Sequence, residues 1–187
     1  MTFTQTEIDG VIIIEPEVHE DHRGFFLESY SQREFEKHGI ELTFVQDNHS
    51  LSAEAGTLRG LHYQAEPMAQ SKLVRVLAGS VFDVAVDLRA ASQTYGKWVG
   101  VTLSAKNKRQ LLIPQGFAHG FMTLEPHTEV AYKVDQYYSP ACDRGIRYDD
   151  PDIAIAWPPL RPILSDKDSA SPYLKDLHMN RKGNTAG

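Results

Sequence analysis

The sequence is organised around Leu58-Arg59-Gly60-Leu61-His62-Tyr63-Gln64 and the run that soon follows, Lys72-Leu73-Val74-Arg75-Val76-Leu77-Ala78-Gly79. Both runs are rich in residues that favour β-strands. They carry a permanent cation in Arg59, a titratable imidazole in His62 and an ammonium group in Lys72. This combination predicts an anion-binding site beside a group that can transfer a proton.

Strand-like runs continue on both sides of this region. Between residues 57 and 138 they are separated by turn residues such as Gly79-Ser80, Gly96 and Pro114-Gln115-Gly116. That spacing favours a double-sheet sandwich or barrel and gives no sign of βαβ alternation. Residues 31–39, with an N-cap candidate in Ser31 and a terminal Gly39, predict a short helix. We expect a mainly β fold with a few short peripheral helices.

Length and charge narrow the functional classes. The 187 residues suit one domain, with a frayed polar tail from Met179 to Gly187. Nineteen Lys and Arg against 25 Asp and Glu give a formal net charge of -6, which argues against nucleic acid or an anionic membrane as partner. The single Cys142 cannot form an internal disulfide, and no secretory leader pattern or long apolar run is seen. These features predict a cytoplasmic protein.

Alternation along three segments sorts side chains into faces. In residues 44–50 one face carries Gln46, Asn48 and Ser50, which suits hydrogen bonding to a polyhydroxylated or heterocyclic ligand, although a solvent-facing strand would look the same. In residues 25–30 Phe26 and Glu28 share a face, either a pocket wall or an exposed edge. In residues 81–88 we expect Asp83 and Asp87 to lie on a solvated or interface face.

A second histidine follows a tight turn in Pro114-Gln115-Gly116-Phe117-Ala118-His119-Gly120-Phe121. This Pro-x-Gly-x-x-His element is similar to the second motif of the cupins, which are double-sheet jelly rolls with an interior ligand pocket. Metal-binding cupins also need a His-x-His pair and a glutamate, and the matching region here offers His62 alone. A metal requires three or four converging ligands, so we expect no metal.

Several motifs in order resemble those of the dTDP-4-dehydrorhamnose 3,5-epimerase family over roughly residues 5–175. They are residues 21–28 (DHRGFFLE), 44–50 (FVQDNHS), 58–64 (LRGLHYQ), 114–121 (PQGFAHGF), 132–133 (YK) and 164–168 (LSDKD). The resemblance implies a metal-free, cofactor-independent jelly roll that works as a homodimer and epimerises a 4-keto-6-deoxyhexose attached to dTDP.

The resemblance, together with the chemistry of such a ketone, assigns four catalytic roles. His62 is the base, oriented by Asp168, and Tyr132 is the acid on the opposite face. Lys72 stabilises negative charge on O4 of the sugar. From the residues alone, Ser165 and Asp166 could instead cap a C-terminal helix, with Asp166 as the fallback partner of His62.

The remaining substrate contacts implied by the resemblance divide between diphosphate and nucleoside. Arg23 and Arg59 suit phosphoryl oxygens because a guanidinium binds them in a bidentate manner. The others are His119, Phe26, Glu28, Gln46, Asp47, Asn48, Tyr138, Asp143 and Lys167, some of them across the dimer interface. Asp143 stands where the family carries a glutamate, so the reach of that contact is shorter.

Strict alternation would put Arg59 and His62, three residues apart, on opposite faces of one strand. We therefore expect a bulge at Gly60 or a strand that starts after Arg59. The sequence leaves three alternative functions open: an epimerase acting at C3 or C5 alone, a metal-dependent cupin enzyme, and a sugar-nucleotide binding module without activity.

Overall fold

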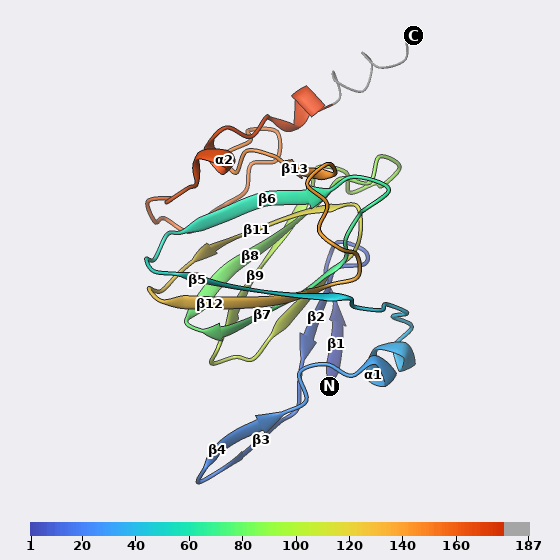
Figure 1. Cartoon of the computed structure of the whole chain (residues 1–187), viewed down its shortest axis with the longest axis vertical. Helices are drawn as coiled ribbons and strands as arrows, with labels where there is room; N and C mark the ends of the chain where they lie inside the picture. Colours follow the sequence, from blue (N-terminus) through green and yellow to red (C-terminus); the bar gives the residue numbers. More distant parts are fainter. Residues whose placement is uncertain (178–187) are drawn as a thin grey trace.

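The computed structural model of the chain describes residues 1–177, so the frayed tail expected from Met179 to Gly187 lies outside the described residues. The predicted mainly β fold is confirmed, and two antiparallel sheets face each other as a jelly roll (Figure 1). The elements are β1 (Thr2–Gln5), β2 (Ile12–Glu15), β3 (Val18–Asp21), β4 (Gly24–Leu27), α1 (Gln32–Lys37), β5 (Gln46–Ser52), β6 (Leu58–Gln64), β7 (Lys72–Ala78), β8 (Ser80–Asp87), β9 (Trp98–Ser104), β10 (Gln110–Ile113), β11 (Phe117–Thr123), β12 (Thr128–Val134), β13 (Asp143–Gly145) and α2 (Asp166–Ser169).

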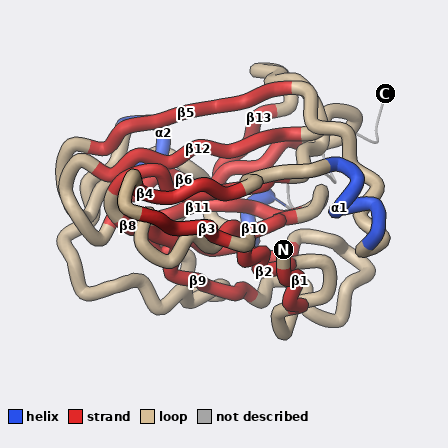
Figure 2. Tube along the Cα trace, turned by 90° about the horizontal axis from the view of Figure 1, so that it is seen from below, coloured by secondary structure: helices blue, strands red, loops and turns tan. Residues whose placement is uncertain are grey.

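The two large sheets are assembled from strands far apart in sequence. The six-stranded sheet has the order β1-β2-β10-β7-β12-β5, and the five-stranded sheet has the order β13-β6-β11-β8-β9. β3 and β4 form a separate hairpin that projects away from both sheets (Figure 1). Seen from below, β5 and β12 run alongside each other in the six-stranded sheet (Figure 2). Consequently β6 and β12 belong to opposite walls of the sandwich.

The core lies between the sheets because alternate side chains of each strand point inward. Val74 and Val76 of β7 are buried there, as alternation predicts, against Val101 of β9 and Phe121 of β11. Two further apolar clusters cover the outer faces. Phe35 of α1 packs on the six-stranded sheet, and the segment after β13 packs on the five-stranded sheet through Ile146, Ile153 and Leu174.

A β-bulge interrupts the pairing of β6 with β11. His62 pairs with His119, and Arg59 pairs with Phe121. Between these two pairs, β6 therefore contains one more residue than β11. Gly60 lies inside this interval with φ +119°, and a Cβ there would be 2.6 Å from Cα of Gly120. The bulge expected at Gly60 is confirmed, whereas the alternative is wrong because β6 already begins at Leu58.

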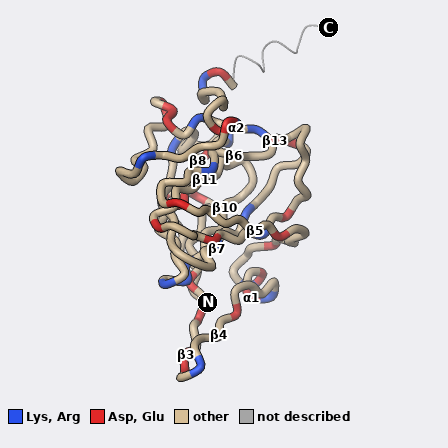
Figure 3. The backbone as a smooth tube through the Cα atoms, turned by 60° about the vertical axis from the view of Figure 1, so that its left-hand side comes forward, with Lys and Arg blue, Asp and Glu red and all other residues tan. Residues whose placement is uncertain are grey.

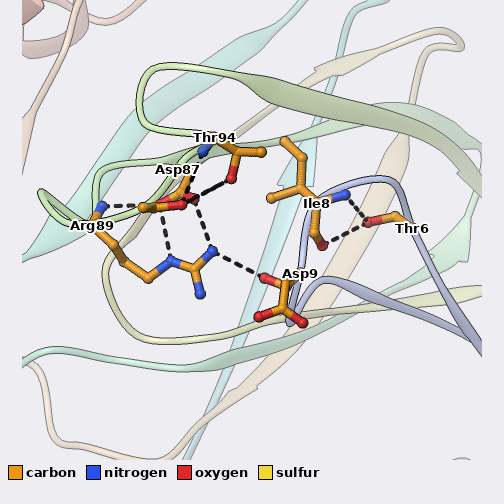
Figure 4. Close-up of polar contacts among 7 residues, drawn as sticks. Thr6, Ile8, Asp9, Asp87, Arg89 and Thr94 are labelled. Carbon is orange, nitrogen blue, oxygen red and sulfur yellow. Dashed lines mark hydrogen bonds and ion pairs between the residues drawn. The ribbon is translucent and has the colours of Figure 1, made fainter.

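The expectation of a solvated or interface face for Asp83 and Asp87 is wrong, because both side chains are fully buried within the single chain. Asp87 accepts hydrogen bonds from Arg89, Ser92 and Thr94, and Arg89 also donates to the backbone oxygen of Asp9 at 3.1 Å (Figure 4). These bonds lower the pKa of Asp87 against the opposing effect of burial. The cluster therefore ties the loop after β8 to the turn between β1 and β2.

Acidic and basic residues are interspersed along the backbone (Figure 3). Within residues 1–177, none of the helices has the length and apolar character that crossing a bilayer requires.

Candidate active site

A cavity of about 460 Å³ opens between the two sheets. Its walls bring together seven of the predicted site residues from five elements: Arg59 and His62 from β6, Lys72 from β7, His119 from β11, Tyr132 from β12, and Lys167 and Asp168 from α2. His62 and Tyr132 therefore share one cavity but come from opposite sheets.

His62 is held by a buried carboxylate. Its Nε2 lies 2.5 Å from Oδ1 of Asp168, and only 4% of Asp168 is exposed. Burial raises the pKa of Asp168, but the hydrogen bond and the charge of the His62 ring outweigh this effect and lower it overall. The predicted contact is present, and it fixes the ring orientation so that Nδ1 is left for other contacts.

The capping interpretation of the same segment is also correct. The Ser165 side chain accepts a hydrogen bond from the backbone N–H of Asp168 at 3.1 Å, as an N-cap of α2 does. The two interpretations are compatible because the cap holds the backbone of Asp168 while its carboxylate reaches His62. Asp166, the fallback partner, is exposed and does not line the cavity.

Lys72 is a buried cation at the start of β7, with 8% of its surface exposed. Its Nζ donates to the backbone oxygen of His62 at 3.4 Å, so the ammonium reaches across from the six-stranded to the five-stranded sheet. Burial lowers the pKa of Lys72 from 10.5 to about 8, although Asp83 and Asp143 oppose the shift. Alternation correctly predicted that Lys72 points inward with Val74 and Val76.

His119 forms a second imidazole–carboxylate pair. Its Nε2 lies 3.0 and 2.9 Å from the two oxygens of Asp83, and both residues are buried. Burial lowers the pKa of His119 against the attraction of Asp83. Asp83 is not among the site residues predicted from the sequence. The available signal was the alternation that places it on the same face as Val81 and Ala85, two apolar residues in the core between the sheets.

Tyr132 and Arg59 complete the lining of the cavity. Tyr132 comes from β12, in the sheet opposite His62, and Arg59 comes from β6. Burial raises the pKa of Tyr132, while the charge of Arg59 acts in the other direction, so the phenol stays protonated at neutral pH. Arg59 donates to the backbone oxygen of Leu51 at 3.1 Å and to Ser52 Oγ at 3.3 Å. The bulge turns Arg59 toward the same cavity as His62, which strict alternation would forbid.

An adjoining cavity of about 240 Å³ shares His62, Lys72, Tyr132 and Lys167 with the first. It adds Gln46, Asn48, Tyr138 and Asp143 from the predicted nucleoside contacts. Asp143 accepts hydrogen bonds from Lys167 Nζ at 2.5 Å and from the Tyr138 hydroxyl at 3.1 Å. The bond to Asp143 raises the pKa of Lys167. The shorter aspartate is therefore within reach of both of these neighbours.

Four predicted residues do not line either cavity. Asp47 points to the other face of the six-stranded sheet, where it pairs with Lys133 at 2.9 Å. Arg23, Phe26 and Glu28 belong to the β3–β4 hairpin and the turn after it. The Arg23 side chain is 79% exposed and pairs with Asp21, and Phe26 is 72% exposed. The hairpin residues therefore do not contribute to the cavity of their own chain.

Potential metal ligands do not gather in this site. Residues 1–177 contain no group of three or more His, Cys, Asp or Glu side chains arranged to hold a metal ion.

Comparisons with known proteins identify relatives of this chain in sequence and in structure. The family model described as dTDP-4-dehydrorhamnose 3,5-epimerase matches residues 5–176. The curated enzyme of that name from Shigella flexneri is 57% identical over 169 residues, which cover 90% of this chain and 93% of the relative.

Two solved structures have closely similar folds. The dTDP-6-deoxy-D-glucose-3,5-epimerase of Legionella pneumophila, in complex with dTDP-4-keto-L-rhamnose, has a TM-score of 0.90 and 51% identity, covering 93% of each chain. A 3'-monoepimerase from Streptomyces bikiniensis, in complex with dTDP-quinovose, has a TM-score of 0.89 and 32% identity, covering 94% of this chain and 89% of that one. Because a family model spans nearly the whole chain and a relative shares more than half of its residues, this protein belongs to the dTDP-4-dehydrorhamnose 3,5-epimerase family.

Proposed function

We propose that this protein inverts C3 and C5 of dTDP-4-dehydro-6-deoxy-D-glucose to give dTDP-4-dehydro-L-rhamnose. The observation that carries the proposal is one cavity in which an imidazole and a phenol come from opposite walls, with a buried ammonium group beside them. C3 and C5 both flank the C4 ketone, so loss of either proton gives an enolate with its charge on O4. Inversion then needs a proton removed from one face and another delivered to the opposite face.

The chemistry divides between three side chains. His62 removes the proton, and Asp168 stabilises the imidazolium that forms and holds the ring in place. Tyr132 delivers a proton from the other wall, which requires a phenol that is protonated at neutral pH. Lys72 places its positive charge in a site shielded from water, where an ammonium stabilises an enolate oxygen most strongly.

The diphosphate and nucleoside occupy the rest of the two cavities in this proposal. Arg59 binds phosphoryl oxygens, and His119 hydrogen-bonds the substrate while Asp83 holds its ring. The nucleoside lies in the adjoining cavity with Gln46, Asn48, Tyr138, Asp143 and Lys167.

We also propose that the protein is a homodimer in which Arg23, Phe26 and Glu28 enter the cavity of a second copy. The support is the hairpin itself, which projects from the sheets and exposes 72% of Phe26 (Figure 1). A large exposed aromatic side chain on a projecting hairpin is typical of an interaction surface.

Mixed dimers test this arrangement. A dimer of one His62→Ala chain and one Arg23→Ala chain retains one intact site if the hairpin serves the neighbouring cavity, so two inactive proteins should regain activity when refolded together. If each hairpin served its own chain, neither site would be intact and the mixture would stay inactive.

The function is tested by incubating the sugar nucleotide with enzyme in deuterated water and analysing the product by NMR. We expect deuterium at C3 and C5 in the parent and at neither carbon in His62→Ala. The similarity to a 3'-monoepimerase makes inversion at C3 alone the second candidate, and it predicts deuterium at C3 only. Binding of dTDP without deuterium incorporation at either carbon would refute both epimerase candidates and indicate a binding module. Loss of deuterium incorporation when a chelator is added would indicate a metal-dependent cupin.

A further inference from the structure

Ser50 has a hydroxyl group that the site described above does not use. It lies on β5 and lines the same cavity as Arg59 and His62. Its Oγ is shielded from solvent and makes no hydrogen bond to any group in residues 1–177. Every other buried side-chain nitrogen or oxygen atom in residues 1–177 has a hydrogen-bond partner.

The neighbours of Ser50 on the same face of β5 are all paired. Asn48 Oδ1 accepts a hydrogen bond from Gln46 Nε2 at 2.9 Å, and Ser52 Oγ accepts one from Arg59 Nε at 3.3 Å. A buried hydroxyl without a partner destabilises the fold, so such groups are rare in proteins and call for a functional explanation. Because no bond holds the Ser50 hydroxyl, rotation about its χ1 torsion can turn it toward a ligand without breaking any contact.

The strand register places Ser50 between two assigned parts of the site. Asn48 pairs with Tyr132 across β5 and β12, Ser50 pairs with Val130, and Ser52 contacts Arg59. Under the proposed function, Arg59 faces the diphosphate and Tyr132 faces the sugar carbons that react. Ser50 therefore faces the atoms in between, where the sugar joins the diphosphate.

We propose that Ser50 is a substrate-binding residue whose hydroxyl donates a hydrogen bond to an oxygen at this junction, either a sugar hydroxyl or a phosphoryl oxygen. The inference rests on the proposed function for the placement of the ligand, but the unpaired hydroxyl itself is a feature of the protein alone.

The test compares Ser50→Ala with Thr128→Val, a matched control. The Thr128 hydroxyl is also fully buried, but it donates to the backbone oxygen of Glu125 at 2.8 Å and lies outside the cavity. Ser50→Ala should lower kcat/KM about tenfold, the value of one hydrogen bond, without lowering the Tm. Thr128→Val should lower the Tm and leave kcat/KM at 25 °C unchanged.

Calorimetric titration with dTDP then identifies the oxygen. Weaker binding of dTDP to Ser50→Ala indicates a phosphoryl oxygen, and unchanged binding together with reduced kcat/KM indicates a sugar oxygen; both support the proposal. Parent values of kcat/KM and of dTDP affinity in Ser50→Ala would overturn it, as would a Tm loss as large as that of Thr128→Val. If the parent does not epimerise the sugar nucleotide but Ser50→Ala still binds dTDP more weakly, the proposed function is wrong. The proposed hydrogen bond from Ser50 to the ligand is then still supported.

Discussion

Replacing Lys72 with methionine should make the protein more stable and much less active. Burial lowers the pKa of this ammonium from 10.5 to about 8. Each unit of difference between the folded and unfolded pKa corresponds to about 1.4 kcal/mol of stability. The folded state therefore loses about 3 kcal/mol at pH 7 by keeping Lys72 charged, and methionine, of similar length and apolar, removes that cost. The same substitution removes the cation beside the enolate, so kcat should fall about 10²- to 10³-fold.

The pH dependence of this stability difference is distinctive. Between the folded pKa of about 8 and the unfolded value of 10.5, the unfolded chain binds more protons at Lys72, so the parent gains stability as the pH rises through this window. The advantage of Lys72→Met should therefore be largest below pH 8 and shrink toward pH 10.5. Urea unfolding at several pH values measures it, with the exposed Lys106→Met as a control that should show no such trend.

Two results would refute the reasoning. One is a Lys72→Met protein that is less stable than the parent at pH 7, because the charge would then be stabilised rather than tolerated in its buried site. The other is a stability difference that does not change between pH 7 and 10.5.

Three further predictions concern the proton carriers and the bulge. Asp168→Asn removes the charge that stabilises the His62 imidazolium, so kcat should fall about 10²- to 10⁴-fold in steady-state assays with little change in affinity for dTDP. Tyr132→Phe should still exchange substrate protons with solvent but yield little inverted product, and an unchanged rate of epimerisation measured by NMR would disprove its assignment as the acid. Gly60→Ala should lower the free energy of unfolding by about 2–4 kcal/mol in urea titrations, because the added Cβ would lie 2.6 Å from Cα of Gly120. Gly24→Ala is the control, because Gly24 has a similar φ of +124° but nothing within 4 Å of an added Cβ. The difference between the two variants gives the contribution of the contact with Gly120.

Alternation and spacing predicted the parts of the site that depend on one strand at a time. Lys72 points inward because it shares a face with Val74 and Val76, and the bulge follows from the need to bring Arg59 and His62 to one side. Neither inference required knowledge of the partner strands, because the alternation of side-chain direction along a strand is a local property.

The predictions that were wrong concern residues whose burial depends on contacts with other strands and loops. Asp83 and Asp87 look like a solvated face in isolation, yet one meets His119 from the adjacent strand and the other is enclosed by its own loop and Arg89. A buried carboxylate is tolerated only when hydrogen bonds compensate for lost hydration. The donors to Asp87 are two to seven residues away, but only the folded loop turns them toward the carboxylate, and the partner of Asp83 is 36 residues away on another strand. The contact of His62 with Asp168, 106 residues away, came from the family resemblance for the same reason.

The local balance of charge explains how a chain with a formal net charge of -6 can attract a diphosphate. Arg59, Lys72 and Lys167 line the two cavities, together with the carboxylates Asp143 and Asp168. Asp143 and Asp168 are already bonded, one to Lys167 and the other to His62. The buried Asp83 offsets part of the charge of Lys72, so the positive field in the cavity comes from Arg59 and the remaining charge of Lys72. Two cations, one of them with a pKa near 8, are a modest attraction for a dianion. An arginine supplied by the hairpin of a second copy would strengthen it, which gives the proposed dimer an electrostatic reason as well as a structural one.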